Sequence, residues 1–224
     1  MSDRITVEHF DIGTLDVDQA IREAEAGVIG DTRADFFRKA AVGGGAMIGG
    51  GVLLAGMPAL AEARPSKRQD VAILNYALTL EYLESAFYIE AVKNGAISGE
   101  VLDTATIIRD HEVTHVKALK QVLGRKAVRK PKFDFADTTS DPAKFLATAV
   151  ALEDTGVAAY AGQGPRLKQK AVIVAALSIH SVEARHAAQV RSLAGMNFAP
   201  KAFDKAKSMK QVLKIVNGTG FIQG

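Results

Sequence analysis

Two copies of one spaced motif constrain this chain more than any other feature. In the first copy a lone Glu stands 31 residues before a Glu-x-x-His, and in the second copy the interval is 30 residues. The residues are Glu81, Glu112 and His115 in the first half, and Glu153, Glu183 and His186 in the second. A Glu and a His three residues apart lie on the same face of a helix. The chain therefore repeats one arrangement of acidic and imidazole side chains.

Apolar residues in steps of three and four around these positions predict an all-α fold. The expected helices are Ser66–Lys93, Ser98–Gly124, Asp141–Gly162 and a fourth that passes Val172 and ends near Gly195. Residues 66–195 show no competing strand period, and the connector 125–140 contains Pro131 and no clear helical period. A connector of that length can run from one end of a bundle to the other. We therefore expect a four-helix bundle with one long central crossover.

Local signals set the expected helix limits. Ser66-x-x-Gln69 is typical of a capping box, and Ser98 is a candidate cap for the second helix. The inward stripe of that second helix is expected to continue as far as Val122. A short helix is expected in the C-terminal tail near Ser208–Val216.

Four Glu at inward positions need countercharge, because burying an unpaired charge costs several kcal/mol. Two divalent ions would balance four carboxylates, and two neutral imidazoles would complete the coordination. We expect Glu112 and Glu183 to bridge the ions, and each ion to keep an open position for dioxygen, peroxide or water. The other expected ligands are Glu81 with His115 at one ion and Glu153 with His186 at the other. The alternative is ordinary salt bridges to Arg109, Lys117, Lys170 or Arg185, which fall outside the inward stripes.

Three further residues share these stripes. Glu84 follows Glu81 by one turn, whereas its counterpart in the third helix is Gly156. Glu84 is expected either as an additional metal ligand in the space beside the glycine or as a supporting carboxylate at the edge of the site. Tyr88 and Tyr160 lie two turns beyond the lone Glu of their helices and are candidate catalytic residues. The alternative for both is a core tyrosine with a bonded hydroxyl.

The available donor types limit the metal. The chain has no cysteine, which excludes thiolate sites, iron–sulfur clusters and disulfides. Carboxylate and imidazole suit iron, manganese or zinc, and we expect iron first and manganese second. His111 and His180 stand near the motifs at different offsets, so we interpret them as supporting or surface histidines.

The formal charge of +3 comes largely from basic residues in the segments 125–132 and 201–214. Neither segment interleaves aromatic residues with the basic ones or forms a basic helical face, as nucleic-acid-binding segments do. We therefore expect a solvated basic surface and no nucleic-acid partner.

The N-terminal arm has a different composition from the rest. Residues 40–61 form a run of 22 without a charge, seven of them glycine. The basic flank Thr32–Lys39 precedes this run, and the small residues of Ala59–Ala63 end it in a cleavage-like pattern. These are the three parts of an export signal, so an exported or membrane-associated protein of the cell envelope is expected.

Two alternatives remain for this segment. Its length spans a bilayer and Gly45-x-x-x-Gly49 has a helix-pairing spacing, which favours a retained membrane anchor. It could instead be a glycine-rich arm of a cytoplasmic protein, packed on the fold or in a homo-oligomer. The flank resembles a twin-arginine signal at Arg33, Phe36 and Arg38, although Ala34 stands where the second arginine belongs.

Three segments carry a family resemblance. They are Ala77–Tyr88 (ALTLEYLESAFY), Asp110–His115 (DHEVTH) and Ser181–His186 (SVEARH), with Phe203-Asp204 in the tail. In these segments the chain resembles the ferritin-like superfamily, and within it the bacterial and fungal branch related to desiccation or stress. The resemblance implies a four-helix bundle with a diiron or dimanganese centre, and it implies no settled reaction. The arm and the tail differ from those of cage-forming ferritins.

These observations divide the chain into the arm 1–63, a ferritin-like bundle 64–195 and a tail 196–224. The first hypothesis is a dimetal oxidoreductase that acts on Fe(II), dioxygen or peroxide in stress defence. The alternatives are a protective protein that binds metal without turnover, and an enzyme similar to manganese catalase.

Overall fold

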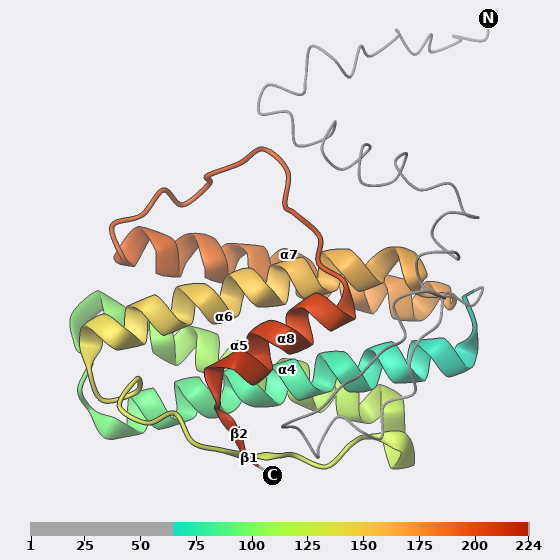
Figure 1. Cartoon of the computed structure of the whole chain (residues 1–224), viewed down its shortest axis with the longest axis horizontal. Coiled ribbons are helices and arrows are strands. Elements are labelled where there is room, and N and C mark those ends of the chain that lie inside the picture. The colour runs from blue at the N-terminus through green and yellow to red at the C-terminus, as the bar shows by residue number, and fades with distance from the viewer. Residues whose placement is uncertain (1–64, 224) are drawn as a thin grey trace, which may run out of the picture. The chain divides into compact units, whose positions relative to one another are not determined.

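Residues 65–223 are described by the structure, a computed structural model in which the expected helices are present (Figure 1). The long helices are α4 (Lys67–Asn94), α5 (Gly99–Leu123), α6 (Pro142–Gln163) and α7 (Lys170–Leu193). A shorter helix, α8 (Met209–Thr219), follows in the tail, and the 3-10 turns η1 (Gly124–Lys126) and η2 (Gly164–Arg166) follow α5 and α6. The predicted export signal lies outside the described residues. None of the described helices combines the length and hydropathy that crossing a bilayer requires.

The helix starts follow the capping signals in part. The Ser66 hydroxyl accepts from the backbone N–H of Gln69 at 3.1 Å, as the capping box requires. The Gln69 side chain does not complete the box, because its amide donates to the carbonyl of Arg166. At α6 the Asp141 carboxylate accepts from the N–H of Lys144 at 2.9 Å. The α6 cap therefore forms as predicted, whereas the α4 box is half formed.

Two expectations about α5 need correction. Ser98 occupies the N-cap position, but its side chain makes no capping hydrogen bond. Val122 is 56% exposed, and Leu123 is buried in its place. An α-helix has 3.6 residues per turn, so the next inward position after Leu119 can be three or four residues on. In this helix it is four residues on, at Leu123.

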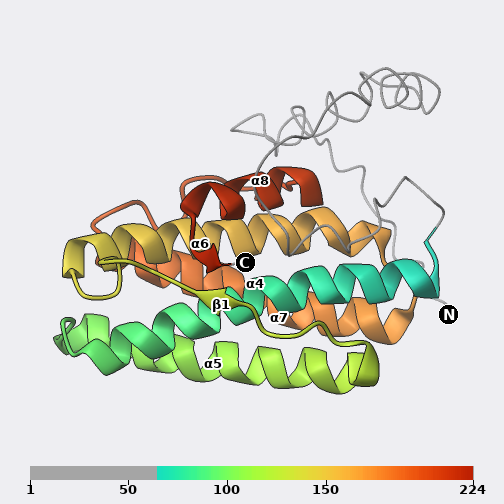
Figure 2. The same cartoon turned by 60° about the horizontal axis from the view of Figure 1, so that its bottom comes forward.

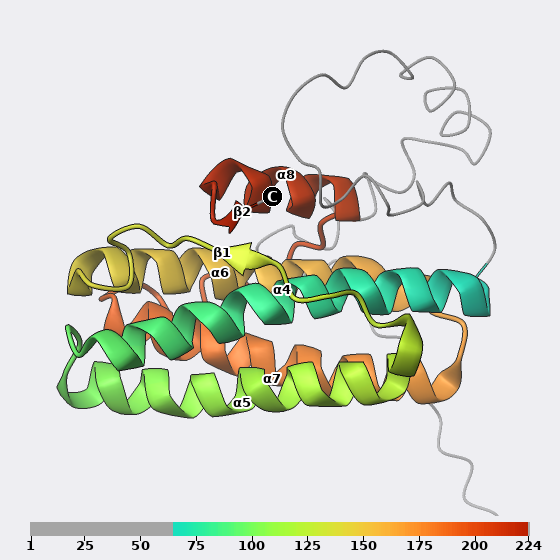
Figure 3. The ribbon, with the colours of Figure 1, turned by 90° about the horizontal axis from the view of Figure 1, so that it is seen from below.

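The helix order is that of a bundle with one long crossover. The chain leaves η1 at one end of the bundle and returns along its whole length before α6 begins (Figure 3). The predicted crossover is therefore confirmed. It carries an element that the sequence pattern did not predict, the two-residue strand β1 (Lys132–Phe133), which pairs antiparallel with β2 (Ile222–Gln223). The partners are far apart in sequence, so no local period reveals them.

The tail helix α8 packs along α6 (Figure 2). Its buried face is formed by Val212 and Val216, which join the main apolar cluster. Before α8, the N–H of Lys207 donates to the carbonyl of Ala158 on α6 at 3.0 Å. A Cβ at Gly162 would stand 1.9 Å from the Lys207 carbonyl oxygen, so only glycine permits this approach. The residues from Lys207 onward are therefore part of the fold.

Two apolar clusters fill the interior of the bundle. One includes stacked Phe87 and Phe145, with ring centres 5.3 Å apart, and the other includes Leu78 and Leu119. Along α4 the second cluster lies mainly before Glu81 and the first mainly after it. The polar residues of the repeated motif therefore stand between two apolar layers.

Candidate metal centre

The six side chains of the repeated motif meet in the middle of the bundle. Their four carboxylates are 0% exposed, and the two imidazoles are 8% and 4% exposed. They form two groups, each with its ligand atoms within 4.8 Å of one another: Glu81, Glu112, His115 and Glu183, and Glu112, Glu153, Glu183 and His186. Glu112 and Glu183 belong to both groups. Each group could hold a metal ion, and the two ions would share these carboxylates.

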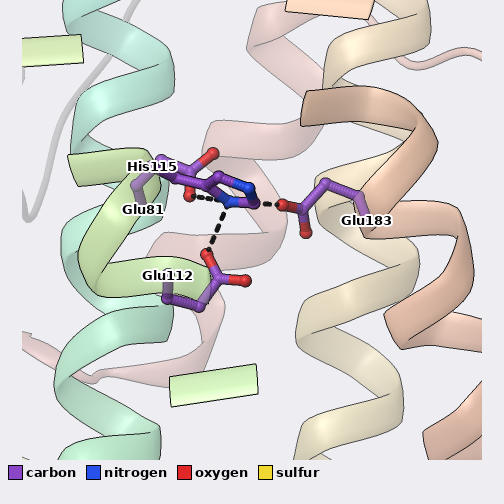
Figure 4. Close-up of side chains that lie close together, drawn as sticks. All are labelled: Glu81, Glu112, His115 and Glu183. Carbon is purple, nitrogen blue, oxygen red and sulfur yellow. Dashed lines mark hydrogen bonds and ion pairs between the residues drawn. The ribbon is translucent and has the colours of Figure 1, made fainter. Parts of the chain in front are cut away.

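The first group is arranged around His115 of α5. Its Nδ1 lies 3.2 Å from Oε2 of Glu81, 3.4 Å from Oε2 of Glu112 and 3.1 Å from Oε1 of Glu183. Figure 4 shows the imidazole facing carboxylates that come from α4, α5 and α7. Three helices therefore converge on one nitrogen.

The second group repeats this arrangement around His186 of α7. Its Nδ1 lies 3.0 Å from Oε1 of Glu112, 3.4 Å from Oε2 of Glu153 and 3.9 Å from Oε2 of Glu183. In both groups, therefore, Nδ1 is the nitrogen turned toward the carboxylates.

Several of these buried atoms lack a hydrogen bond within the described residues. They are Oε1 of Glu112, Oε2 of Glu153, both carboxylate oxygens of Glu183 and Nδ1 of His186. The contacts of His186 above have the length of ion pairs, but their angles do not suit hydrogen bonds. Buried polar atoms without a partner are costly, whereas lone pairs directed at a common point suit a metal ion. The donor set therefore fits divalent cations.

Basic side chains do not neutralise this cluster. Among the described residues, the ion pairs of its carboxylates involve only His115 and His186. Arg109, one of the alternative partners considered for the cluster, pairs with the neighbouring Asp110 at 2.8 Å. Ordinary salt bridges to Lys or Arg therefore do not account for the buried Glu.

In the metal-free protein the pKa values of Glu81 and Glu153 are shifted in one direction and that of Glu112 in the other. Burial, together with the charges of Glu112 and Glu183, raises the pKa of Glu81 well above its usual range. Burial likewise raises the pKa of Glu153 to about 8. Burial acts in the same direction on Glu112, but its close contacts with the imidazoles of His115 and His186 outweigh burial and lower its pKa to about 2.

The imidazoles hold protons in the same state. Burial opposes a charged His115, yet the carboxylates of Glu112, Glu183 and Glu81 outweigh it and raise its pKa to about 12. His186 has a pKa of about 12 for the corresponding reason, with Glu112, Glu153 and Glu183 as its neighbours. Without metal, protons therefore supply part of the positive charge that the carboxylates require.

Tyr88 and Tyr160 contact the lone Glu of the opposite half. The Tyr88 hydroxyl on α4 donates to Oε1 of Glu153 on α6 at 2.6 Å, and the Tyr160 hydroxyl on α6 donates to Oε1 of Glu81 on α4. Burial raises the pKa of both hydroxyls well above the usual value, so both stay protonated. Both tyrosines therefore have bonded hydroxyls beside the candidate ligands, and a catalytic role for them stays a prediction.

Glu84 fills the space that Gly156 leaves open. A Cβ at Gly156 would stand 3.1 Å from Oε1 of Glu84 and 3.3 Å from Oε2 of Glu183. Glu84 is 3% exposed, but it does not belong to either of the four-residue groups. Burial, followed by the charge of Glu183, raises its pKa well above the usual range. Glu84 is therefore a fifth buried carboxyl beside the cluster, and its role as a ligand stays a prediction.

His111 contacts a candidate ligand, which agrees with the supporting role that was one of the two expected for it, although its partner was not predicted. Its Nδ1 lies 2.9 Å from Nε2 of His186. Burial, and then the neighbouring His186, lowers the pKa of His111 below its usual value. Position 111 carries no sequence signal for this contact, because the contact depends on how α5 is rotated against α7. His180 has no such contact, and its buried Nδ1 lacks a partner within the described residues.

Comparison with known proteins agrees with this architecture. The ferritin-like domain family matches residues 69–196, which is more than half of the chain and includes all six side chains of the repeated motif. A comparison with curated proteins gives no match. The fold, the repeated motif and the extent of the family match lead to one conclusion: the chain belongs to the ferritin-like domain family.

Proposed function

We propose that this protein binds two divalent metal ions within its bundle and acts as an oxidoreductase on Fe(II), dioxygen or peroxide in stress defence. The observation that carries the proposal is the pair of overlapping four-residue groups that share Glu112 and Glu183. Two adjacent ions with common carboxylates can exchange electrons with the same small molecule. A set of isolated single-ion sites would not offer that property.

Charge supports two ions instead of one. The four shared and terminal carboxylates carry four negative charges when ionised, and two divalent ions balance them. With the ions bound, the imidazoles can be neutral, and each can offer the Nδ1 lone pair that already faces the carboxylates. The oxygen and nitrogen donors favour iron or manganese. Bound iron or manganese would supply Lewis acidity and electrons for reaction with dioxygen or peroxide.

The surrounding residues hold the carboxylates in place. The tyrosine hydroxyls of Tyr88 and Tyr160 each fix one oxygen of a terminal carboxylate, which leaves the other oxygen free for a metal. The two apolar clusters exclude water from both sides of the centre along the bundle. Glu84 places one more carboxyl beside Glu183, and we propose that it is an additional ligand.

The test is metal content followed by turnover. Full-length protein purified without chelator is analysed for iron and manganese, loaded with Fe(II) under argon, and then exposed to dioxygen or hydrogen peroxide. We expect two ions per chain, oxidant consumption and growth of ferric absorbance. Glu112→Gln should abolish all three, whereas Glu100→Gln, an exposed position on the same helix, should leave them intact. Tyr88→Phe and Tyr160→Phe should slow turnover if the hydroxyls take part in it.

The same measurements separate the alternatives. Two bound ions without oxidant consumption would indicate a protective metal-binding protein that turns nothing over. Oxygen release from peroxide by the manganese-loaded form alone would indicate an enzyme similar to manganese catalase. A chain that binds neither iron nor manganese would refute the proposal.

A further inference from the structure

The contact between His111 and His186 has the geometry of a hydrogen bond. The ring centres are 5.2 Å apart, the planes differ by 16°, and the nearest nitrogens are 2.9 Å apart. The nearest nitrogens are much closer to each other than the ring centres are, and the two ring planes are nearly parallel. The rings therefore meet edge to edge and are not stacked face to face. The lone pair of one nitrogen therefore points at the N–H of the other.

The two nitrogens of His186 have different neighbours. Nδ1 faces the carboxylates of Glu112 and Glu153, and Nε2 faces His111. A neutral imidazole has one N–H and one lone pair, so a metal bound at Nδ1 leaves the proton on Nε2. Among the residues that the structure describes, the acceptor at hydrogen-bond distance from that proton is Nδ1 of His111.

The other half of the molecule lacks this contact. Within residues 65–223, the polar contacts of His115 are all made by its Nδ1. The residue that corresponds to His111 is Val182, since each directly precedes the shared Glu of its own helix. A valine side chain cannot accept a hydrogen bond. Within the described part of the chain, the imidazole of His186 therefore has an outer hydrogen-bond partner and that of His115 does not.

We propose that His111 is a positioning residue that holds His186 in its metal-binding tautomer and makes the Glu153–His186 position the tighter of the two ion positions. This inference rests on the proposed function, because it requires that the protein binds two ions. An outer hydrogen bond of this kind fixes the ring orientation and raises the basicity of the ligating nitrogen. Losing such a partner typically lowers metal affinity by about 10- to 100-fold.

The test is a Co(II) titration of metal-free, full-length protein under argon, followed by visible absorption. We expect two binding steps of unequal affinity in the wild type. His111→Val, which copies the residue of the other half, should weaken the tighter step by about 10- to 100-fold and leave the weaker step unchanged. His111→Asn, which retains an acceptor, should recover part of the loss. Thr114→Val, at an exposed position one turn away, is the matched control and should behave as wild type.

A second measurement distinguishes positioning from folding. In the Co(II)-loaded wild type, the Nε2 proton of His186 should give a hyperfine-shifted, exchangeable proton resonance protected from solvent by the hydrogen bond. In His111→Val this resonance should broaden or vanish. The melting temperature of the metal-free form should stay within a few degrees.

The outcomes separate the two proposals. Absence of Co(II), Fe(II) and Mn(II) binding by the wild type refutes the proposed function. Two bound ions with both affinities unchanged in His111→Val refute the role of His111 alone. An equal weakening of both steps in His111→Val also refutes it, because the contact supports one position only.

Discussion

The half of the bundle formed by α4 and α5 and the half formed by α6 and α7 carry the same three-residue motif with different supporting residues. In both halves, a lone Glu accepts a hydrogen bond from the tyrosine of the opposite half. The halves differ at two positions. The first half has Glu84 where the second has Gly156, and it has His111 where the second has Val182. The two halves therefore have the same inner carboxylates and imidazoles, while the residues around them differ. The two candidate ion positions have similar ligands in unequal surroundings.

This comparison predicts that the shared carboxylates matter more than the terminal ones. Glu112→Gln changes a residue of both groups, so it should remove both ions, whereas Glu81→Gln changes one group and should remove one. Both variants should keep their helicity, because the apolar clusters that hold the helices together are untouched. Metal per chain after gel filtration, with circular dichroism as the control, measures the difference. Retention of one ion by Glu112→Gln would contradict the shared role.

The stability of the metal-free protein should fall as pH rises from 5 to 8. In the unfolded chain, glutamate side chains release their protons near pH 4.5. In the folded state, Glu81, Glu84 and Glu153 keep their protons above that pH. The imidazoles do the same above 6.5. Because the folded state binds more protons across this range, the free energy of unfolding decreases as pH rises.

Two residues of the site work in the opposite direction. The lowered pKa of His111 adds stability as pH rises toward 6.5, and this offsets part of the decrease. The lowered pKa of Glu112 stabilises the fold above 4.5, and this contribution is lost as pH falls toward about 2. Urea unfolding of chelator-treated protein at several pH values measures the slope. Metal affinity should show the reverse trend and rise with pH, because metal displaces these protons. A stability that is flat or increasing between pH 5 and 8 would show that the buried cluster does not hold excess protons.

The smallest expected effect concerns the asymmetry at Gly156. A change from Gly to Ala inside a helix ordinarily stabilises by about 0.5–1 kcal/mol. In Gly156→Ala we expect no such stabilisation, and we expect weaker metal binding. The reason is that the added Cβ would crowd the carboxylates of Glu84 and Glu183. Gly164→Ala, where nothing lies within 4 Å of the added carbon, is the matched control and should leave metal binding unchanged.

A double variant identifies the cause of that effect. Gly156→Ala combined with Glu84→Ala removes the crowding side chain and should restore metal binding toward the level of Glu84→Ala alone. If the double variant binds as weakly as Gly156→Ala, the contact with Glu84 does not explain the loss. Equal metal affinity in Gly156→Ala and wild type would show that the carboxylates shift at no cost.

The features that could be predicted from the sequence are those that helical periodicity and helix capping determine. Helix limits near Ser66 and Asp141 follow from side chains that satisfy local N–H groups, and the inward position of the six motif residues follows from helical spacing. The crossover followed from a connector that is too long for a tight turn. These features depend on residues a few positions apart.

Contacts between helices could not be predicted in the same way. The hydrogen bond between His111 and His186 depends on the rotation of α5 and α7, and a shift of one residue would remove it. The approach of Lys207 to Gly162 and the pairing of Phe133 with Ile222 join segments that share no pattern. Two residues of strand are too few for a periodic signal.

The pairing of β1 with β2 bears on the order in which the chain folds. It joins residues 91 positions apart, Lys132 and Gln223, and closing so long a loop carries an entropic cost before any contact is gained. The six motif residues lie between positions 81 and 186, so the centre can assemble while the C-terminal residues are still unplaced. We expect the tail to dock last and to open first, which pulse-labelled hydrogen exchange can detect as late protection of α8 and β2. The residues of the candidate metal centre would then be in place before β2 pairs with the crossover strand β1.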